Sequence, residues 1–163
     1  MPKPPKTGLR VVVAGASGLV GEATLEALGD ADLPVASVEA LASDKSVGRN
    51  VQFGSRSLPI GVLADFDFTE ADLALFAVDA DVAGVHIPRA LAAGCRVIDA
   101  SVRYHDEPGV PLCLPSAGTL PDEVRAARLA SLPVPAAAAL ARVLAPLAAA
   151  AGLVRVDVTV LEP

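Results

Sequence analysis

The sequence predicts an α/β fold in which a doubly wound, mostly parallel sheet carries helices on both faces. Two observations lead to this prediction. Apolar runs of strand length alternate along the chain with stretches of helical periodicity, and the first run leads directly into a glycine-rich turn at residues 15–21. Strands that alternate with helices form parallel sheets, and helices cover both faces of such a sheet.

The glycine turn Gly15-Ala16-Ser17-Gly18-Leu19-Val20-Gly21 follows the apolar run 9–14 and precedes a helical pattern. In such a unit, typical of Rossmann-type folds, the first glycine permits a tight turn and the second lets backbone N–H groups approach phosphates. The third lets the helix pack on the strand. The helix N-terminus adds the positive end of its dipole. We expect the turn to bind the diphosphate of a dinucleotide through Gly15, Ser17, Gly18, Leu19, Val20 and Gly21; a purely structural turn is the alternative.

The later elements follow from periodicity and turn signals. Residues 47–63 alternate apolar and polar side chains around Gly54-Ser55, which predicts a small antiparallel excursion. Further strands are expected at 35–41, 72–78, 96–98, 110–114 and 154–161. Helices are expected at 82–93, where Gly94 provides the C-terminal cap, and at 135–151, where proline is tolerated in the first turn.

Composition limits the classes of partner. The chain has 163 residues, 53% of them hydrophobic, and a formal net charge of −6. This length suits one domain with a substantial core. No basic cluster exceeds three residues, so we expect no nucleic-acid partner. Cys95 and Cys113 lack the spacing and histidine neighbours of a zinc site, so we expect no metal. We expect neither cysteine to form a disulfide, which fits a cytoplasmic location.

Two segments imitate membrane signals. The basic N-terminus resembles a signal peptide, but glycines interrupt the apolar run that follows it. Residues 129–154 are long and uncharged enough to span a bilayer, yet Arg142 would lie near the centre and three prolines interrupt the stretch. We therefore expect a buried core helix there and no membrane partner.

Further short motifs follow the glycine turn in a specific order and spacing. They are Leu41-Ala42-Ser43-Asp44-Lys45-Ser46-Val47-Gly48, Phe66-Asp67-Phe68, Ala74-Leu75-Phe76, Ala93-Gly94-Cys95-Arg96-Val97-Ile98-Asp99, Val110-Pro111-Leu112 and Leu144-Ala145-Pro146-Leu147. With them the chain resembles the aspartate-semialdehyde dehydrogenase family, and more closely its divergent oxidoreductase-like paralogues. The match runs over residues 9–163 and corresponds to the N-terminal half of a family member.

The resemblance implies a division of the chain into three parts. Residues 1–8 are expected to be a flexible tail, and residues 9–152 a Rossmann-type NAD(P)-binding domain. Residues 153–163 then correspond to the truncated first strand of a second domain for substrate binding and dimerisation. An unpaired apolar strand invites association, so this segment is expected to pair with a second copy, fold back onto the sheet or be disordered. Pairing is the favoured outcome.

The resemblance also implies NADP as the cofactor. In the family a serine and an arginine after the second strand bind the 2′-phosphate, and Ser43, Lys45 and the adjacent Ser46 occupy this place here. Lysine keeps the charge but loses the planar donor geometry, and a solvated turn is the alternative. Asp79 and Asp81 replace a glycine-rich loop of the family, so binding is expected to be weak or vestigial. Alternatively, Asp81 caps a helix that begins at Val82.

The family reaction, reductive dephosphorylation of aspartyl phosphate in amino-acid biosynthesis, needs a cysteine thiolate. The resemblance places Pro135 at the nucleophile, His105 at a phosphate-binding arginine, Ala100 at an asparagine and Ser116 at an acidic residue. We therefore expect no catalytic residue in this chain.

Other reactive side chains are given structural interpretations. We interpret Cys95 and Cys113 as buried packing residues, His86 as a partly exposed helix residue and His105 as a solvated loop residue. Two hypotheses remain for the function. One is an oxidoreductase of altered chemistry that a second domain completes. The other is a pseudoenzyme that acts as a scaffold, as a homo-oligomer or as a hetero-oligomer with an active paralogue.

Overall fold

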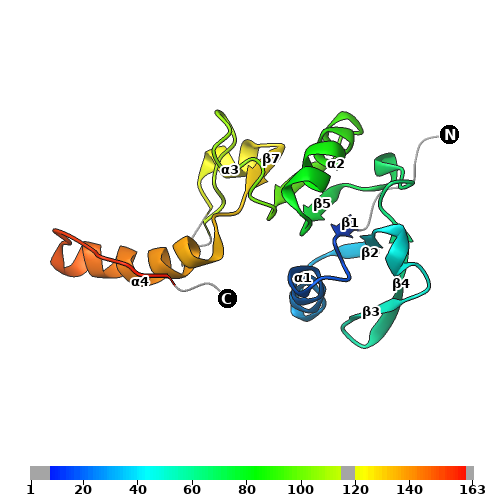
Figure 1. The fold of residues 1–163 in the computed structure, drawn as a ribbon, viewed down its shortest axis with the longest axis horizontal. Coiled ribbons are helices and arrows are strands. Elements are labelled where there is room, and N and C mark those ends of the chain that lie inside the picture. The colour runs from blue at the N-terminus through cyan, green and yellow to red at the C-terminus, as the bar shows by residue number, and fades with distance from the viewer. Residues whose placement is uncertain (1–7, 115–119, 161–163) are drawn as a thin grey trace.

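A seven-stranded sheet organises the chain (Figure 1). The computed structural model describes residues 8–114 and 120–160. The strand order is β3-β4-β2-β1-β5-β6-β7, and every pairing except β3 with β4 is parallel. The strands are β1 (Leu9–Ala14), β2 (Val35–Ala42), β3 (Asn50–Phe53), β4 (Arg56–Val62), β5 (Leu73–Phe76), β6 (Arg96–Asp99) and β7 (Leu129–Ser131). The helices are α1 (Leu19–Asp30), α2 (Ala80–Ala92), α3 (Asp122–Ala126) and α4 (Pro135–Ala151), with short 3-10 turns η1 (Asp44–Ser46) and η2 (Phe68–Glu70).

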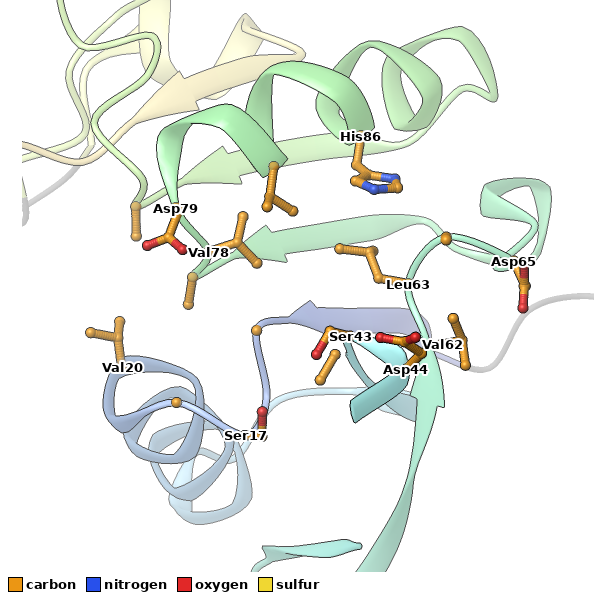
Figure 2. Close-up of a pocket in the computed structure, with 17 residues that line it drawn as sticks. Ser17, Val20, Ser43, Asp44, Val62, Leu63, Asp65, Val78, Asp79 and His86 are labelled. Atoms are coloured by element: carbon orange, nitrogen blue, oxygen red, sulfur yellow. The ribbon is translucent and has the colours of Figure 1, made fainter. Parts of the chain in front are cut away.

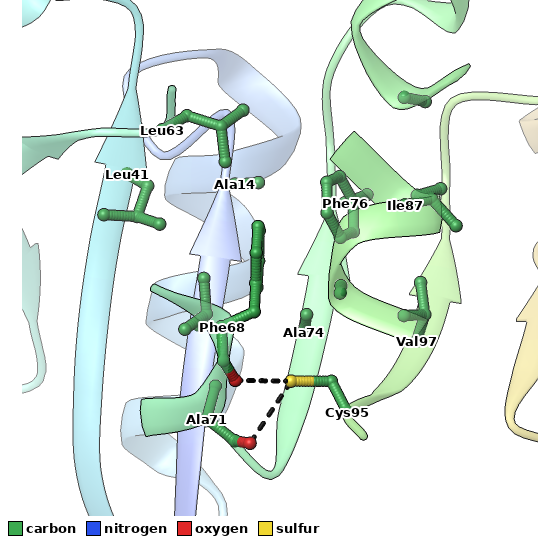
Figure 3. Packing of buried hydrophobic residues seen from close by; sticks show 13 residues of the cluster. Ala14, Leu41, Leu63, Phe68, Ala71, Ala74, Phe76, Ile87, Cys95 and Val97 are labelled. Carbon is green, nitrogen blue, oxygen red and sulfur yellow. Dashed lines mark hydrogen bonds between the residues drawn. The ribbon is translucent and has the colours of Figure 1, made fainter. Parts of the chain in front are cut away.

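The two faces of the central strand β1 are both buried. Val11 and Val13 belong to the cluster that contains Leu25 of α1, whereas Val12 and Ala14 belong to the cluster that contains Ile87 and other residues of α2 (Figure 3). Successive side chains of a strand point to opposite faces, so a continuous valine run is what a strand covered on both sides requires. The predicted doubly wound parallel sheet is confirmed.

The antiparallel excursion is also confirmed. β3 and β4 form a hairpin whose register runs from Asn50 opposite Pro59 to Phe53 opposite Arg56. Gly54, at the tip, has a φ of +56°, a conformation that glycine adopts without strain. β4 then pairs in parallel with β2, so the hairpin lengthens the main sheet. Its carboxyl end thereby joins the edge at which β1 and β2 end.

The region after β6 departs from the prediction. The strand expected at 110–114 is only an isolated bridge between Leu112 and Ser131. The partner of β6 is instead β7, which the sequence interpretation had placed inside a buried helix. The buried carboxylate of Asp99 explains this arrangement, because it accepts hydrogen bonds from the backbone N–H of Ser101 at 2.8 Å and the hydroxyl of Ser131 at 3.3 Å. The contact with Ser131 joins residues 32 positions apart, so no local periodicity predicts it.

Helix α2 begins earlier than predicted, which corrects one assignment. Its N-cap is Asp79, and Asp81 lies in the first turn, so the prediction that Asp81 caps a helix starting at Val82 is wrong. The side chain of Asp79 makes no capping hydrogen bond. β5 is likewise shorter than the predicted strand 72–78, because the chain turns after Phe76 to reach the helix.

Helix α4 forms where expected but does not lie in the core. None of its residues is buried, and the helix projects away from the sheet, so the prediction of a buried core helix is wrong (Figure 1). Residues 152–160 form no strand within the described part of the chain, since a strand requires a partner. None of the helices in the described ranges is long and apolar enough to cross a membrane.

Candidate functional site

A cleft of about 820 Å³ opens at the carboxyl ends of the parallel strands (Figure 2). β1 lies between β2 and β5, so the chain leaves β1 toward one side of the sheet and later returns to its other side. Ligands of open α/β sheets bind at this kind of switch point. The lining consists of Gly15, Ser17, Gly18 and Val20 around the glycine turn, residues 42–44 after β2, residues 62–65 at the end of β4, residues 77–79 after β5, Val82 and His86 on α2, and Ala100 after β6.

The glycine turn has the tight geometry that its sequence predicts. Gly15 has a φ of +87°, and a Cβ atom there would overlap the carbonyl group of Ala77. A Cβ atom at Gly21 would overlap the carbonyl group of Gly15, so α1 packs directly against the turn. Gly18 differs, because a Cβ atom there would meet one atom at an ordinary 3.5 Å. Because no atom crowds Gly18, its backbone is accessible from the cleft.

The N-terminus of α1 supplies donors to this surface. Gly18 is the N-cap residue, and no side chain caps the helix. The first N–H groups of a helix lack partners within the helix and mark the positive end of its dipole. A phosphate group placed beside Ser17 and Gly18 would satisfy these donors. The geometry therefore suits the diphosphate of a nucleotide.

The other residues predicted for the phosphate turn are placed differently. Val20 lines the cleft with Ser17 and Gly18, whereas Gly21 is buried behind the turn. Leu19 is 88% exposed and lines a separate hollow beside β3 instead of the cleft. Its side chain therefore lies outside the cleft lining.

The turn after β2 is tied to the glycine turn. The hydroxyl of Ser46 donates a hydrogen bond to the hydroxyl of Ser17 at 3.2 Å, and Ser46 is buried. Ser43 lines the cleft directly. Lys45 is exposed and is not part of the lining, although it stands in the same 3-10 turn. The structure thus brings Ser43, Ser46 and Ser17 together and leaves Lys45 exposed outside the lining.

The charged side chains that line the cleft are acidic. Asp44, Asp65 and Asp79 contribute carboxylates, and the described lining contains neither lysine nor arginine. The sequence interpretation identified Asp79 but missed Asp44 and Asp65. Their place in the sequence could have identified them, because residues that follow parallel strands gather at one edge of the sheet. A bound diphosphate would meet helix N–H groups there, without a lining cation.

His86 also lines the cleft, a placement that the sequence interpretation missed. Its predicted partial exposure is confirmed, but its ring points toward the cleft from α2, four residues after Val82 (Figure 2). Nη1 of Arg89 lies 2.7 Å from Nδ1 of His86. Burial, and secondarily the charge of Arg89, lower the pKa of His86. Both effects favour the neutral imidazole.

Among the described residues that the family reaction implies, Pro135 and His105 lie outside the cleft lining. Pro135 is the first residue of α4, and Nδ1 of His105 lies 3.2 Å from a carboxylate oxygen of Asp106. Ala100 lines the cleft, and Ser116 lies outside the described residues.

Both cysteines are confirmed as buried. Burial raises the pKa of the Cys113 thiol, which disfavours a thiolate nucleophile. Over residues 8–114 and 120–160, no group of three His, Cys, Asp or Glu side chains could hold a metal ion.

The chain is similar to known proteins over most of its length. Residues 10–127 match the family described as semialdehyde dehydrogenase, NAD binding domain. An aspartate-semialdehyde dehydrogenase of Legionella pneumophila is 41% identical over 66% of this chain and 31% of its own length. A USG-1 protein homolog of Pseudomonas aeruginosa is 40% identical over 86% of this chain and 42% of its own length.

A solved structure repeats the fold. Aspartate semialdehyde dehydrogenase II of Vibrio cholerae superposes with a TM-score of 0.81 at 27% identity, over 90% of this chain and 44% of that one. The chain thus spans less than half the length of these relatives. Three observations therefore indicate the same family: the glycine turn, the cleft at the switch point and the family match over residues 10–127. The chain belongs to the semialdehyde dehydrogenase NAD-binding domain family.

Proposed function

We propose that the chain binds NADP(H) weakly and does not carry out the parental reductive dephosphorylation. The observation that carries this proposal is the uncapped N-terminus of α1 beside Ser17 and Gly18, at the edge of a cleft of about 820 Å³. Backbone N–H groups there fit a diphosphate, and the cleft is large enough for a nucleotide. Titration with NADPH, followed by nicotinamide fluorescence, tests the proposal.

Ser43 and Lys45 support a preference for the 2′-phosphate. Ser43 lines the cleft, and Lys45 belongs to the adjoining 3-10 turn. Two hydrogen bonds hold this turn in place: the Asp44 carboxylate accepts from the backbone N–H of Lys45, and the Ser46 hydroxyl donates to Ser17. A lysine acts on phosphate as a point charge and needs no fixed fork geometry. The carboxylates of Asp44 and Asp79 oppose the phosphates, so we propose an affinity on the order of 10⁻⁵ M or weaker.

The proposed lack of parental catalysis rests on Pro135. Proline has no nucleophilic atom, and Cys95 and Cys113 are both buried outside the cleft lining. We therefore propose a pseudoenzyme role in which the cleft binds a nucleotide and catalyses no reaction. We also propose a cytoplasmic location, because a reducing compartment suits a chain whose few cysteines serve as buried packing residues.

The runner-up function is the cofactor half of an oxidoreductase with altered chemistry. The superposition with a solved dehydrogenase over 90% of this chain favours it, as does the length of the relatives. A second domain would then supply the groups that bind substrate. Hydride transfer to an aldehyde by the chain joined to such a domain would distinguish this function from the pseudoenzyme.

We also propose that the chain associates with a second copy through residues 153–160. Val154, Val156, Val158 and Val160 are all exposed, and they alternate with Arg155, Asp157 and Thr159. An antiparallel pair centred on Val156 would place Arg155 of each copy opposite Asp157 of the other. Opposite charges across a strand pair stabilise it, and the valines would share one buried face.

A further inference from the structure

We infer that His86 recognises the adenine ring of the bound dinucleotide, and that Arg89 positions it for this contact. The inference rests on the proposed function, because it assigns a part of the same cleft to one end of the ligand. Neither residue belongs to the glycine turn or to the turn after β2. Their contribution would therefore concern the base rather than the phosphates.

The position of His86 selects one end of the cleft. Nη2 of Arg89 donates to the carbonyl oxygen of Phe66 at 3.2 Å, and its guanidinium lies over the ring of Phe68, 5.7 Å from the centroid. These contacts fasten α2 to the segment that follows β4. His86 consequently lies near Leu63, away from Asp79 at the other end of the cleft (Figure 2).

The walls at this end suit a flat aromatic base. Val62, Leu63 and Val82 line the cleft there with apolar side chains, and His86 adds the face of a neutral ring. The turn that carries Ser43 also lies on this side, because β2 and β4 are neighbours in the sheet. A nucleoside whose ribose approaches Ser43 would bring its base against these walls, while the diphosphate lies at Gly18.

The contact with Arg89 fixes which nitrogen of His86 carries the proton. A guanidinium has donors only, so Nδ1 of His86 must accept at 2.7 Å and Nε2 must bear the hydrogen. The single N–H of the ring lies in the ring plane, so this arrangement leaves a neutral imidazole for stacking on a base. A protonated imidazole would lose this arrangement, since both of its nitrogens would then be donors facing a cation.

The test compares the two halves of the ligand. Titrations with AMP and with nicotinamide mononucleotide, followed by ligand-observed NMR, and with NADPH, followed by fluorescence, would be made on the wild type, His86→Ala, His86→Phe and Arg89→Met. Val85→Ala is the matched control, because Val85 is on the same helix and 62% exposed outside the lining. Melting temperatures confirm that each variant is folded.

We expect His86→Ala to weaken AMP and NADPH by about tenfold, the usual value of one base stacked on an aromatic residue, and to leave nicotinamide mononucleotide unchanged. His86→Phe should recover part of the loss, and Arg89→Met should weaken AMP selectively. Unchanged AMP affinity in His86→Ala, or an equal loss for both mononucleotides, would overturn the inference. A wild type that binds no NADPH would instead refute the proposed function.

Discussion

Gly21 contacts Gly15 so closely that no side chain fits between the first turn of α1 and the end of β1. A Cβ atom at Gly21 would overlap the carbonyl group of Gly15, and one at Gly15 would overlap that of Ala77. At this point the three segments approach one another through backbone atoms. The consequence is that the glycines of this turn serve different purposes, and substitution can separate them.

Gly21→Ala should destabilise the fold, because backbone on both sides must move to admit the methyl group. Gly18→Ala should leave the melting temperature nearly unchanged, since its Cβ meets only ordinary contacts, and yet weaken NADPH by tenfold or more by blocking phosphate approach. Differential scanning calorimetry and fluorescence titration measure the two effects. Equal losses of stability in both variants would contradict the separation.

The cofactor prediction concerns Lys45. The wild type should bind NADPH more tightly than NADH, with a dissociation constant on the order of 10⁻⁵ M or weaker. Lys45→Ala should remove the preference and leave NADH affinity unchanged, because only the 2′-phosphate would lose its counter-charge. Isothermal calorimetry gives both constants, and Arg49→Ala, an exposed cation just beyond the same turn, is the control. Submicromolar NADPH binding or a wild-type preference for NADH would refute the prediction.

The chemical prediction concerns Pro135. Neither the wild type nor Pro135→Cys should oxidise aspartate semialdehyde in the presence of phosphate, because position 135 lies outside the cleft lining and His105 is paired with Asp106. The assay follows NADPH formation by the absorbance of the reduced nicotinamide. Turnover above the rate without protein, in either form, would exclude the pseudoenzyme.

Asp67 should make stability depend on pH. Its side chain accepts a hydrogen bond from the backbone N–H of Thr69 at 3.0 Å, which lowers the pKa of Asp67 below its ordinary value. A lowered native pKa adds stability above the unfolded pKa, near 4, and this stability is lost as pH falls through the native pKa. The melting temperature of the wild type should exceed that of Asp67→Ala near neutrality, and the difference should shrink on acidification.

Asp67→Ser is the matched control for this titration. Serine keeps an acceptor for Thr69 but does not ionise, so its advantage over alanine should be the same at every pH. A wild-type advantage that grows on acidification would contradict the assignment.

Association through residues 153–160 predicts a charge-reversal pattern. Light scattering should show a concentration-dependent dimer for the wild type and a monomer for a chain that ends at Gly152. Arg155→Asp should weaken the dimer, because two carboxylates would then face each other, and the double variant with Asp157→Arg should restore it. A wild-type monomer at all concentrations would refute the proposed pairing.

Local pattern was sufficient for some elements and not for others. The valine run of β1, the turn at Gly54 and the helix from Pro135 were predictable, because each follows from a short periodicity or a turn residue. β7 was not, because three residues are too few for a period and Asp99 holds them through long-range hydrogen bonds. The error about α4 has another cause, since apolar composition indicates a helix without saying what covers it.

The candidate site divides in the same way. Sequence reasoning placed Gly15, Ser17 and Gly18 at the candidate site because they belong to one short motif of neighbouring residues. His86 was not placed there, because its position depends on Arg89 reaching the carbonyl of Phe66, 23 residues earlier in the sequence. Isolated histidines on helices carry no signal of this kind.

The two cysteines lie in different packing units, which makes them natural reporters of local opening. Sγ of Cys95 donates to the carbonyl oxygens of Phe68 and Ala71 within the main cluster beneath α2 (Figure 3). Cys113 belongs to a small separate cluster with Val124 and Ala130. A thiol reagent reaches either sulfur only when its own cluster opens. The order in which the two thiols react therefore shows whether the edge of the sheet at β7 unfolds locally before the centre of the sheet does.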